Sequence, residues 1–600
     1  MNILKLLQSS DSEGNARKYS AEKLAILIGC PPAAVLTSLG FVPSVPLHYL
    51  CSMLGLVIFG IILISESTPK RAFMATGIFG TICHSLALGW IMNVMTTFGE
   101  MPALLAGVII VLFGMYLTLL PALGSWAAAR LVPNNLFLRH LVLIPVFWSM
   151  SDVFYAWFLS GFPWDWLCYT QTDSLLSGFA PLLGGEGVTL LLLIITMSVS
   201  LSLAKRNPVF LTAGIFIVTL AFVVRDLSFV TPLNPVKTTL IQGNIKTETK
   251  WRPENVIPII ETYYSLSAEA IDTDIMVWPE SAVPAFENDL ENPERGLHII
   301  SELHRYMKNH GVGFITGIQY YENSPLGFED PEATHGLRFY NSMIAMGVTD
   351  AQGRADYELL NHNRYQKKHL VPVGEFIPYQ IRQLTRSLGP IFNMPMNSFN
   401  PGSPEQQNIE VRGLNAASAI CYEIIFGNEL REQIKPHTNF IVTLSNDGWF
   451  TGTQGPIQHL NIARMRAMEF QKPVLRATNN GISAIIDRNG NILGSLGENV
   501  AGHLSGIMTP NQGLTPFARY GRLPLYLIYV LSLVFCLARV INLLRLASTE
   551  KMRLRAAKDN PESDTSLSRE SRDAVPDSGN SGKPLRQLEM MLKRFTNSDK

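Results

Sequence analysis

Charged side chains are scarce in this chain of 600 residues, since Asp, Glu, Lys and Arg together make up 16% of it, against about a quarter in typical soluble proteins. The formal net charge is zero, so the chain lacks the basic excess of a nucleic-acid-binding protein. The scarcity is uneven: residues 22 to 225 are almost free of charge, 236 to 512 read as a soluble domain, and 523 to 544 are apolar. The length predicts several domains rather than one.

Cysteine is also rare, and five of the six cysteines lie in or beside apolar segments. Cys421 is the only one in the large polar region. A lone cysteine excludes a disulfide within that region and a zinc site built from cysteines. Cys421 is then either an inert buried thiol, which its position alone favours, or a nucleophile. No metal-binding cluster and no His-Glu-x-x-His motif occurs, so we expect no cofactor and no metal.

What the chain has in abundance is long apolar runs. A transmembrane helix needs about 20 apolar residues to cross a hydrocarbon core about 30 Å thick. Candidate spans lie near 22–42, 47–64, 73–95, 103–126, 139–159, 186–204, 208–224 and 523–544. We therefore predict a seven-helix transmembrane domain over 22–225 and an eighth transmembrane helix over 523–544, with an exported domain of 236–512 between them.

The loops between these spans predict an orientation, because Lys and Arg concentrate on the cytoplasmic side. Basic residues occur in the N-terminal segment, in alternate loops and after the last span, whereas the loops 43–46, 96–102 and 160–185 contain none. Both the N-terminus (1–21) and the tail (545–600) are then cytoplasmic, and 236–512 lies on the opposite side. The polar tail is predicted to be largely disordered. If the number of spans is miscounted by an even number, this orientation is kept. If it is miscounted by an odd number, the loops no longer fit the charge pattern.

The region 236–512 alternates short β-rich runs with helical stretches, which predicts an α/β fold with a buried sheet. The helices are expected at 253–271, 293–310 and Ile457–Glu469. The strands are expected at Thr238–Ile245, Ile275–Trp278, Gly313–Ile318, Ser342–Met346, Ala416–Ile420, Phe440–Leu444 and Gly481–Ile486.

Three polar motifs follow apolar strands in this region: Trp-Pro-Glu280-Ser, Lys367-Lys368-His369-Leu-Val-Pro and Cys421-Tyr422-Glu423. Cysteine chemistry needs a thiolate, a base and donors that hold an oxyanion, and these motifs offer all three. Each residue alone has an ordinary interpretation. Glu280 could be a surface carboxylate, the lysines a solvated pair, and His369 a structural histidine. A Cys-His protease is disfavoured because no cysteine-protease signature surrounds Cys421.

Taken together in the order Glu280, Lys367, Cys421, the motifs resemble the nitrilase (carbon-nitrogen hydrolase) superfamily, whose triad is Glu-Lys-Cys. The chain has eight predicted spans, and such a domain lies before the last of them. This arrangement narrows the resemblance to the apolipoprotein N-acyltransferase family, over roughly residues 20 to 545. Further matching segments are Gln242–Ile245 with Lys250-Trp251, Gly161-Phe162-Pro163-Trp164, Asn446–Phe450, Gln458–Ala467 and Arg476–Ile482. Val373 and Gly448 depart from the family pattern, at positions that are not expected to carry chemistry but could line an acyl pocket.

The resemblance implies an αββα sandwich for 236–512 and roles for named residues. Glu280 would be the base, Lys367 rather than Lys368 an oxyanion donor, and Cys421 the nucleophile. Glu375 and Glu423 would support the site, and the Tyr422 backbone N–H would be a second oxyanion donor. Trp251 and Trp449 would line or gate a pocket, although ordinary core packing is an equal alternative.

The activity that the resemblance implies is a ping-pong N-acyl transfer in the bacterial inner membrane, with the catalytic domain on the periplasmic side. The donor would be a membrane phospholipid and the acceptor the amine of a diacylglyceryl apolipoprotein. Two alternatives remain. One is a membrane-anchored nitrilase-type amidase acting on a periplasmic amide. The other is a transporter or lipid-binding protein with a catalytically dead outer domain, which the intact triad and the lack of charge within most spans disfavour.

Overall fold

The computed structural model describes residues 12–65, 68–292, 294, 296–329, 334–350, 357–360, 362–372, 374–376 and 399–559. The expectations for the first eleven residues, for Val373 and for most of the tail fall outside the described residues. Met1–Ile528 forms one compact unit, and Tyr529–Lys600 forms a second.

The first part of the chain is helical, as its apolar runs predict. Its helices are α1 (Ser12–Leu39), α2 (His48–Ser65), α3 (Pro69–Ala87), α4 (Trp90–Asn93) with η2 (Val94–Phe98), α5 (Ala103–Leu131), η3 (Leu138–Leu143) with α6 (Ile144–Tyr155), α7 (Ala180–Lys205) and α8 (Leu211–Val224). The long helix α17 (Leu523–Asp559) comes last among the described residues. Each of the predicted spans overlaps at least one of these helices.

Length and composition let several of these helices cross a membrane. Among the described residues, four stretches qualify alone: His48–Ser65, Ala103–Leu131, Leu175–Lys205 and Leu523–Arg555. A fifth is added if the pair Pro69–Ala87 and Trp90–Phe98, bent by 52°, counts as one span. The apolar helices Leu24–Leu39 and Pro208–Val224 are shorter. The count of eight crossings therefore stays a prediction.

Glycines let α3 and α5 pack closely. A Cβ on Gly80 would lie 2.5 Å from the Thr118 side chain, and one on Gly114 would lie 2.8 Å from the Thr81 carbonyl. Lipid-embedded helices associate through such small residues, because burial of apolar surface gives no advantage between helices that are already in an apolar solvent.

The second part of the chain forms two facing sheets. One has the strand order β16 (Gly502–Met508), β2 (Val236–Gln242), β3 (Ile275–Val277), β7 (Gly313–Asn323), β8 (Leu337–Gly347), β9 (Arg364–Gln366), with β4 (Val283–Phe286) also on β7. The other has the order β10 (Ile409–Val411), β11 (Leu414–Ile420), β12 (Thr438–Ser445), β13 (Val474–Thr478), β14 (Ser483–Ile486), β15 (Ile492–Leu496). Strands β2, β3 and β7 run parallel, as do β11, β12 and β13.

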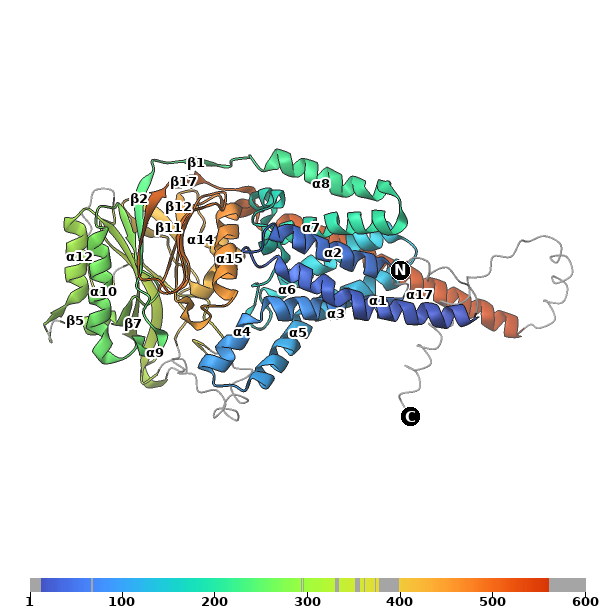
Figure 1. Ribbon diagram of the computed structural model, residues 1–600, viewed down its shortest axis with the longest axis horizontal. Helices are drawn as coiled ribbons and strands as arrows, with labels where there is room; N and C mark the ends of the chain where they lie inside the picture. Colours follow the sequence, from blue (N-terminus) through green and yellow to red (C-terminus); the bar gives the residue numbers. More distant parts are fainter. Residues whose placement is uncertain are drawn as a thin grey trace. The chain divides into compact units, whose positions relative to one another are not determined.

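Helices cover the outer face of each sheet (Figure 1). Helices α10 (Val256–Glu269) and α12 (Ile299–Asn309) lie on the first sheet, and α14 (Gly427–Gln433) and α15 (Gly455–Phe470) lie on the second. Leu240, Val277 and Ile315 of the first sheet pack against Ile420 and Val442 of the second in one buried core. The expected αββα sandwich is thus confirmed.

Helix α15 also packs against the helical part of the chain. Glu469 accepts a hydrogen bond from the Gly185 N–H at 2.8 Å, and the Trp164 indole donates to Gln458 at 2.8 Å. Arg464 forms an ion pair with Asp173. Both faces of α15 are therefore buried, which explains why its polar residues interrupt the apolar face expected from the sequence.

Candidate active site

The three predicted catalytic residues come from both sheets of the sandwich. Glu280 follows β3, Lys367 follows β9, and Cys421 follows β11 directly. Groups that follow parallel strands collect at the carboxyl edge of a sheet, and the face-to-face packing of the two sheets brings these edges together. Both Glu280 and Lys367 lie close enough to Cys421 to shift its pKa.

Lys367 is the centre of a buried charge cluster. Its side chain is 1% exposed, and its Nζ lies 2.8 Å from Glu375 Oε1 and 3.5 Å from Glu280 Oε1. Asn341 Nδ2 donates to the same two oxygens, at 2.8 Å to Glu280 and 3.2 Å to Glu375. Burial lowers the pKa of Lys367, but the two carboxylates raise it by more, so the net shift is upward. Lys367 therefore stays a cation at neutral pH.

Glu280 is held at both its carboxylate and its backbone. Its Oε2 accepts the Asn446 backbone N–H at 2.9 Å. Its carbonyl accepts the Nζ of Lys250 at 3.2 Å. Lys250 is fully buried, and burial lowers its pKa to about 8, against the opposing effect of the Glu280 charge. The carboxylate is thus pre-oriented, as a general base must be.

Cys421 lies at the turn from β11 into the short helix η12 (Cys421–Ile425) with φ of 54°, in the left-handed region. Burial and the Glu280 charge raise the pKa of its thiol to about 12, and Lys367 opposes this. The resting thiol is therefore neutral at physiological pH. Because the thiolate is the nucleophile, reaction at Cys421 needs a base that takes the proton during attack, and Glu280 is the carboxylate whose charge acts most strongly on this thiol.

Glu423 is a buried acceptor for the two segments that carry Lys367 and Cys421. Its Oε1 accepts from Tyr365 Oη (2.9 Å), Lys368 N (2.7 Å) and His369 N (3.0 Å). Its Oε2 accepts from Ile420 N at 2.7 Å. Burial raises the pKa of Glu423, and these backbone donors limit the rise. The carboxylate joins the Lys367 segment to the end of β11.

His369 has a structural environment. Its Nδ1 lies 2.9 Å from Glu429 Oε1, its Nε2 lies 2.8 Å from the Ser160 carbonyl, and its ring stacks on Phe426 at 3.7 Å. Tyr422 donates its hydroxyl to the neighbouring Gly161 carbonyl at 2.9 Å. Both ring nitrogens of His369 are thus engaged away from Cys421, as the structural interpretation predicts.

The two predicted tryptophans have different surroundings, and several other aromatic rings pack where the helical and catalytic parts of the chain meet. Trp449 packs on Phe98 at 4.8 Å, and Trp251 is 46% exposed with the Nζ of Lys250 5.7 Å from its ring. Contacts between rings of the helical and catalytic parts also involve Trp90, Phe162, Trp164, Tyr422 and Phe450. Trp449 belongs to an aromatic contact between the two parts of the chain, whereas Trp251 lies partly in solvent.

Sequence reasoning missed the contributions of Asn341 and Lys250. Asn341 lies inside β8, where only its contacts reveal a function. Lys250 belongs to a segment that matches the family, but nothing in the sequence indicates that its Nζ reaches the Glu280 carbonyl. Gly448 lies against Thr247 and Asn480, and a Cβ there would lie 2.3 Å from Thr247 Oγ1; its place in an acyl pocket stays a prediction.

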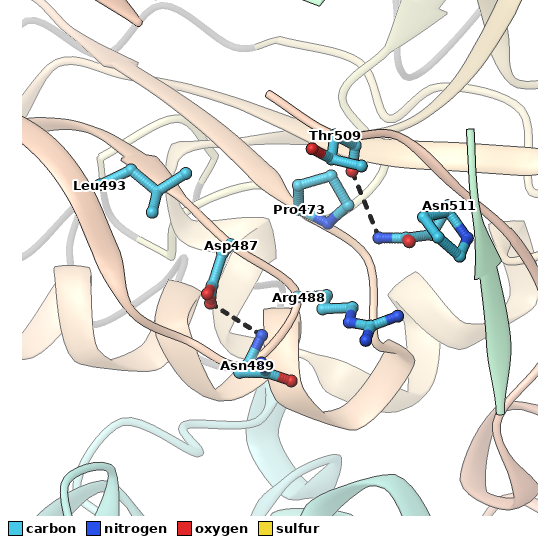
Figure 2. A pocket seen from close by; sticks show the side chains of 8 residues that line it. Pro473, Asp487, Arg488, Asn489, Leu493, Thr509 and Asn511 are labelled. Atoms are coloured by element: carbon cyan, nitrogen blue, oxygen red, sulfur yellow. Dashed lines mark hydrogen bonds between the residues drawn. The ribbon is translucent and has the colours of Figure 1, made fainter. Parts of the chain in front are cut away.

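A separate pocket of about 270 Å³ lies at the other end of β13 and β14 (Figure 2). Its lining is Pro232, Pro473, Asp487, Arg488, Asn489, Leu493, Thr509 and Asn511. None of the predicted site residues is among them, so this pocket is not the candidate active site.

Comparisons with known proteins match both parts of the chain. A family model described as apolipoprotein N-acyltransferase N-terminal domain matches residues 33–198, and one described as carbon-nitrogen hydrolase matches 237–509. A Vibrio cholerae protein named apolipoprotein N-acyltransferase is 36% identical over 82% of this chain and 93% of its own length. Proteins of the same name from Vibrio vulnificus and Shewanella oneidensis are each 37% identical, over 79% and 77% of this chain and 89% and 87% of their own lengths.

Proposed function

Because this chain belongs to the apolipoprotein N-acyltransferase family, we propose that it moves a fatty acyl chain from a membrane phospholipid, through a thioester on Cys421, to the N-terminal amine of a diacylglyceryl apolipoprotein. The placement of Glu280 and Lys367 beside the Cys421 thiol carries the mechanistic part of the proposal. Helices long and apolar enough to cross a membrane support a site close to lipid substrates.

In the first half-reaction, Glu280 takes the Cys421 proton as sulfur attacks the ester carbonyl of the phospholipid. The charge on the tetrahedral oxygen is held by the Lys367 ammonium and the Tyr422 N–H. The ester C–O bond then breaks, the proton on Glu280 passes to the leaving oxygen, and lysophospholipid departs. A thioester remains on Cys421, which makes the scheme ping-pong.

In the second half-reaction, the acceptor amine attacks the thioester and Glu280 takes its proton. The C–S bond breaks, the proton on Glu280 passes to the Cys421 sulfur, and the acylated lipoprotein leaves. Glu375 holds Lys367 in place through both steps, since its carboxylate lies 2.8 Å from Nζ. Aromatic contacts between the helical and catalytic parts favour an apolar approach to the site, which suits acyl chains and disfavours water.

Location follows from the charge pattern of the loops. The catalytic domain would face the periplasm and both termini the cytoplasm of an inner-membrane protein. A periplasm-dependent phosphatase fused after Phe229 should be active, and one fused after Lys205 inactive. The reverse pattern would contradict this orientation.

The test of the chemistry is the acyl-enzyme itself. Purified protein and Cys421→Ala are incubated with phospholipid and no acceptor, and intact masses are measured. A hydroxylamine-labile increment of one acyl group that requires Cys421 supports the mechanism. No adduct in folded wild-type protein contradicts it and favours the amidase, which would release its acyl group to water.

A further inference from the structure

A fully buried polar network lies behind Cys421. His459 on α15, Asp447 of η13 (Asp447–Trp449) and Arg476 on β13 all have side chains that are 0% exposed. Nε2 of His459 lies 3.1 Å from the Cys421 carbonyl oxygen. Arg476 pairs with Asp447 at 2.6 Å and lies 3.2 Å from Nδ1 of His459. The mechanism described above uses none of these three side chains.

The contacts determine which nitrogen of His459 carries a proton. A carbonyl oxygen can only accept, so Nε2 must donate to Cys421. Burial and the Arg476 charge lower the pKa of His459, and the Asp447 carboxylate opposes this shift. Nδ1 lies 3.2 Å from the Arg476 guanidinium and 3.2 Å from Asp447 Oδ1, and Arg476 also pairs with Asp447. The orientation of the Nε2–H bond is thereby fixed from the far side of the ring.

The Cys421 carbonyl and the Tyr422 N–H belong to one peptide unit. In a planar trans peptide these two bonds point in opposite directions, so a partner that holds the carbonyl also aims the N–H. That N–H stands at the start of η12, where the first donors of a helix have no partner within the helix. The positive φ of Cys421 is a conformation that needs such support from its surroundings.

We propose that His459 is a positioning residue that aims the Tyr422 N–H at the oxyanion by holding the carbonyl of the same peptide. The inference rests on the proposed function, because it concerns the oxyanion formed when Cys421 is acylated. It assigns His459 no proton transfer and no contact with substrate.

Close packing keeps the network in one arrangement. The Trp164 ring lies 5.1 Å from the His459 ring, and Ser445 hydrogen-bonds Asp447. A Cβ on Gly481 would lie 2.2 Å from Asp447 Oδ2, so the backbone approaches the carboxylate as closely as a glycine allows. His459 consequently has little freedom to lose its contact with Cys421.

The test compares His459→Leu, which has no donor, with His459→Gln, whose amide can still donate. His304→Gln is the matched control, because His304 is a buried histidine on α12 whose Nδ1 accepts the Gly347 N–H at 3.0 Å, remote from the site. Each protein is assayed for single-turnover acylation by phospholipid and for alkylation of the Cys421 peptide by iodoacetamide. Alkylation displaces iodide and forms no oxyanion.

His459→Leu should slow acylation about 10-fold or more, a fraction of the loss caused by deleting an oxyanion donor, with the alkylation rate nearly unchanged. His459→Gln should recover most of the acylation rate, and His304→Gln should match wild type. Wild-type acylation in His459→Leu, or an equal loss of alkylation, overturns the inference and leaves the proposed function standing. A wild-type protein that is never acylated defeats the proposed function, and the inference falls with it.

Discussion

Adjacent lysines in this chain have opposite surroundings. Successive side chains of an extended segment point to opposite sides, so Lys367 turns into the site and Lys368 turns out of it. Lys367 is buried against Glu280 and Glu375, whereas the Nζ of Lys368 reaches the Pro404 carbonyl at 3.3 Å near the surface. The family pattern points to the same lysine.

Alanine substitutions at Lys367 and at Lys368 test whether only Lys367 contributes to catalysis. Lys367→Ala should reduce acyl-enzyme formation by about 10²- to 10³-fold, the usual effect of losing an oxyanion donor, because no other described cation pairs with the Glu280 carboxylate. Lys368→Ala should react as wild type. Single-turnover mass measurements compare them, and an equal loss in both variants would contradict the assignment of Lys367.

Glu423 should matter for stability as well as for activity. Glu423→Gln replaces one acceptor oxygen by an amide that meets donors already pointing at it, such as the Ile420 N–H. Leaving buried donors unpaired costs about 1–3 kcal/mol, so we expect a drop of that size in the free energy of unfolding. Denaturant unfolding in detergent measures it. Glu432→Gln, on the exposed face of α14, is the control, and an equal drop there would contradict the explanation.

Among the elements, α15 shows how tertiary contacts change the meaning of a pattern. The sequence places a helix over Ile457–Glu469 with a broken apolar face, and the helix runs over Gly455–Phe470. The breaks occur where polar residues face the helical part of the chain. Arg464 meets Asp173 there, and Glu469 meets the Gly185 N–H.

The end of α15 also predicts a pH dependence. Burial lowers the pKa of Lys472 from 10.5 to about 7. Between pH 7 and 10.5 the unfolded chain therefore binds more protons at this residue than the folded chain does, and stability should rise with pH, by at most about 1.4 kcal/mol per pH unit. Lys472→Met should show a smaller rise between pH 7 and 9. Unfolding followed across that range measures the slope, and an identical slope in both proteins would contradict the prediction.

At the scale of the whole molecule, the catalytic sandwich depends on the helical part of the chain. One outer layer of the sandwich contains α15, whose Gln458, Arg464 and Glu469 have partners in residues before 226. Without those partners, buried polar groups would face water or each other, and apolar surface between them would be exposed.

A fragment of residues 229–513 should therefore aggregate or elute as large oligomers, while the full-length protein in detergent remains homogeneous. Size-exclusion chromatography with circular dichroism measures this. A monomeric fragment that unfolds with the same cooperativity as the full chain would contradict the dependence. The triple replacement Gln458→Leu, Arg464→Leu and Glu469→Leu in the fragment should lower its solubility further, since it adds apolar surface to the face that the helical part no longer covers.

Local pattern was sufficient for many elements and insufficient for others. The expected strand Gly313–Ile318 lies within β7, and Ala416–Ile420 lies within β11. Strand β13 (Val474–Thr478) was not expected, because Arg476 in its middle breaks the apolar run. Its partner Asp447 on another element makes that arginine tolerable in the core.

By itself the sequence determined the apolar segments, the α/β alternation and the order of Glu280, Lys367 and Cys421, because these depend on composition and on short-range periodicity. Only the tertiary structure decided that Asn341 joins Glu280 to Glu375 and that Lys250 holds the Glu280 carbonyl. It also decided that His459 holds the peptide after Cys421. The physical reason is that a hydrogen bond depends on the distance and direction between two groups. These partners are between 30 and 61 residues apart in the chain, so no local sequence pattern can show that they are in contact.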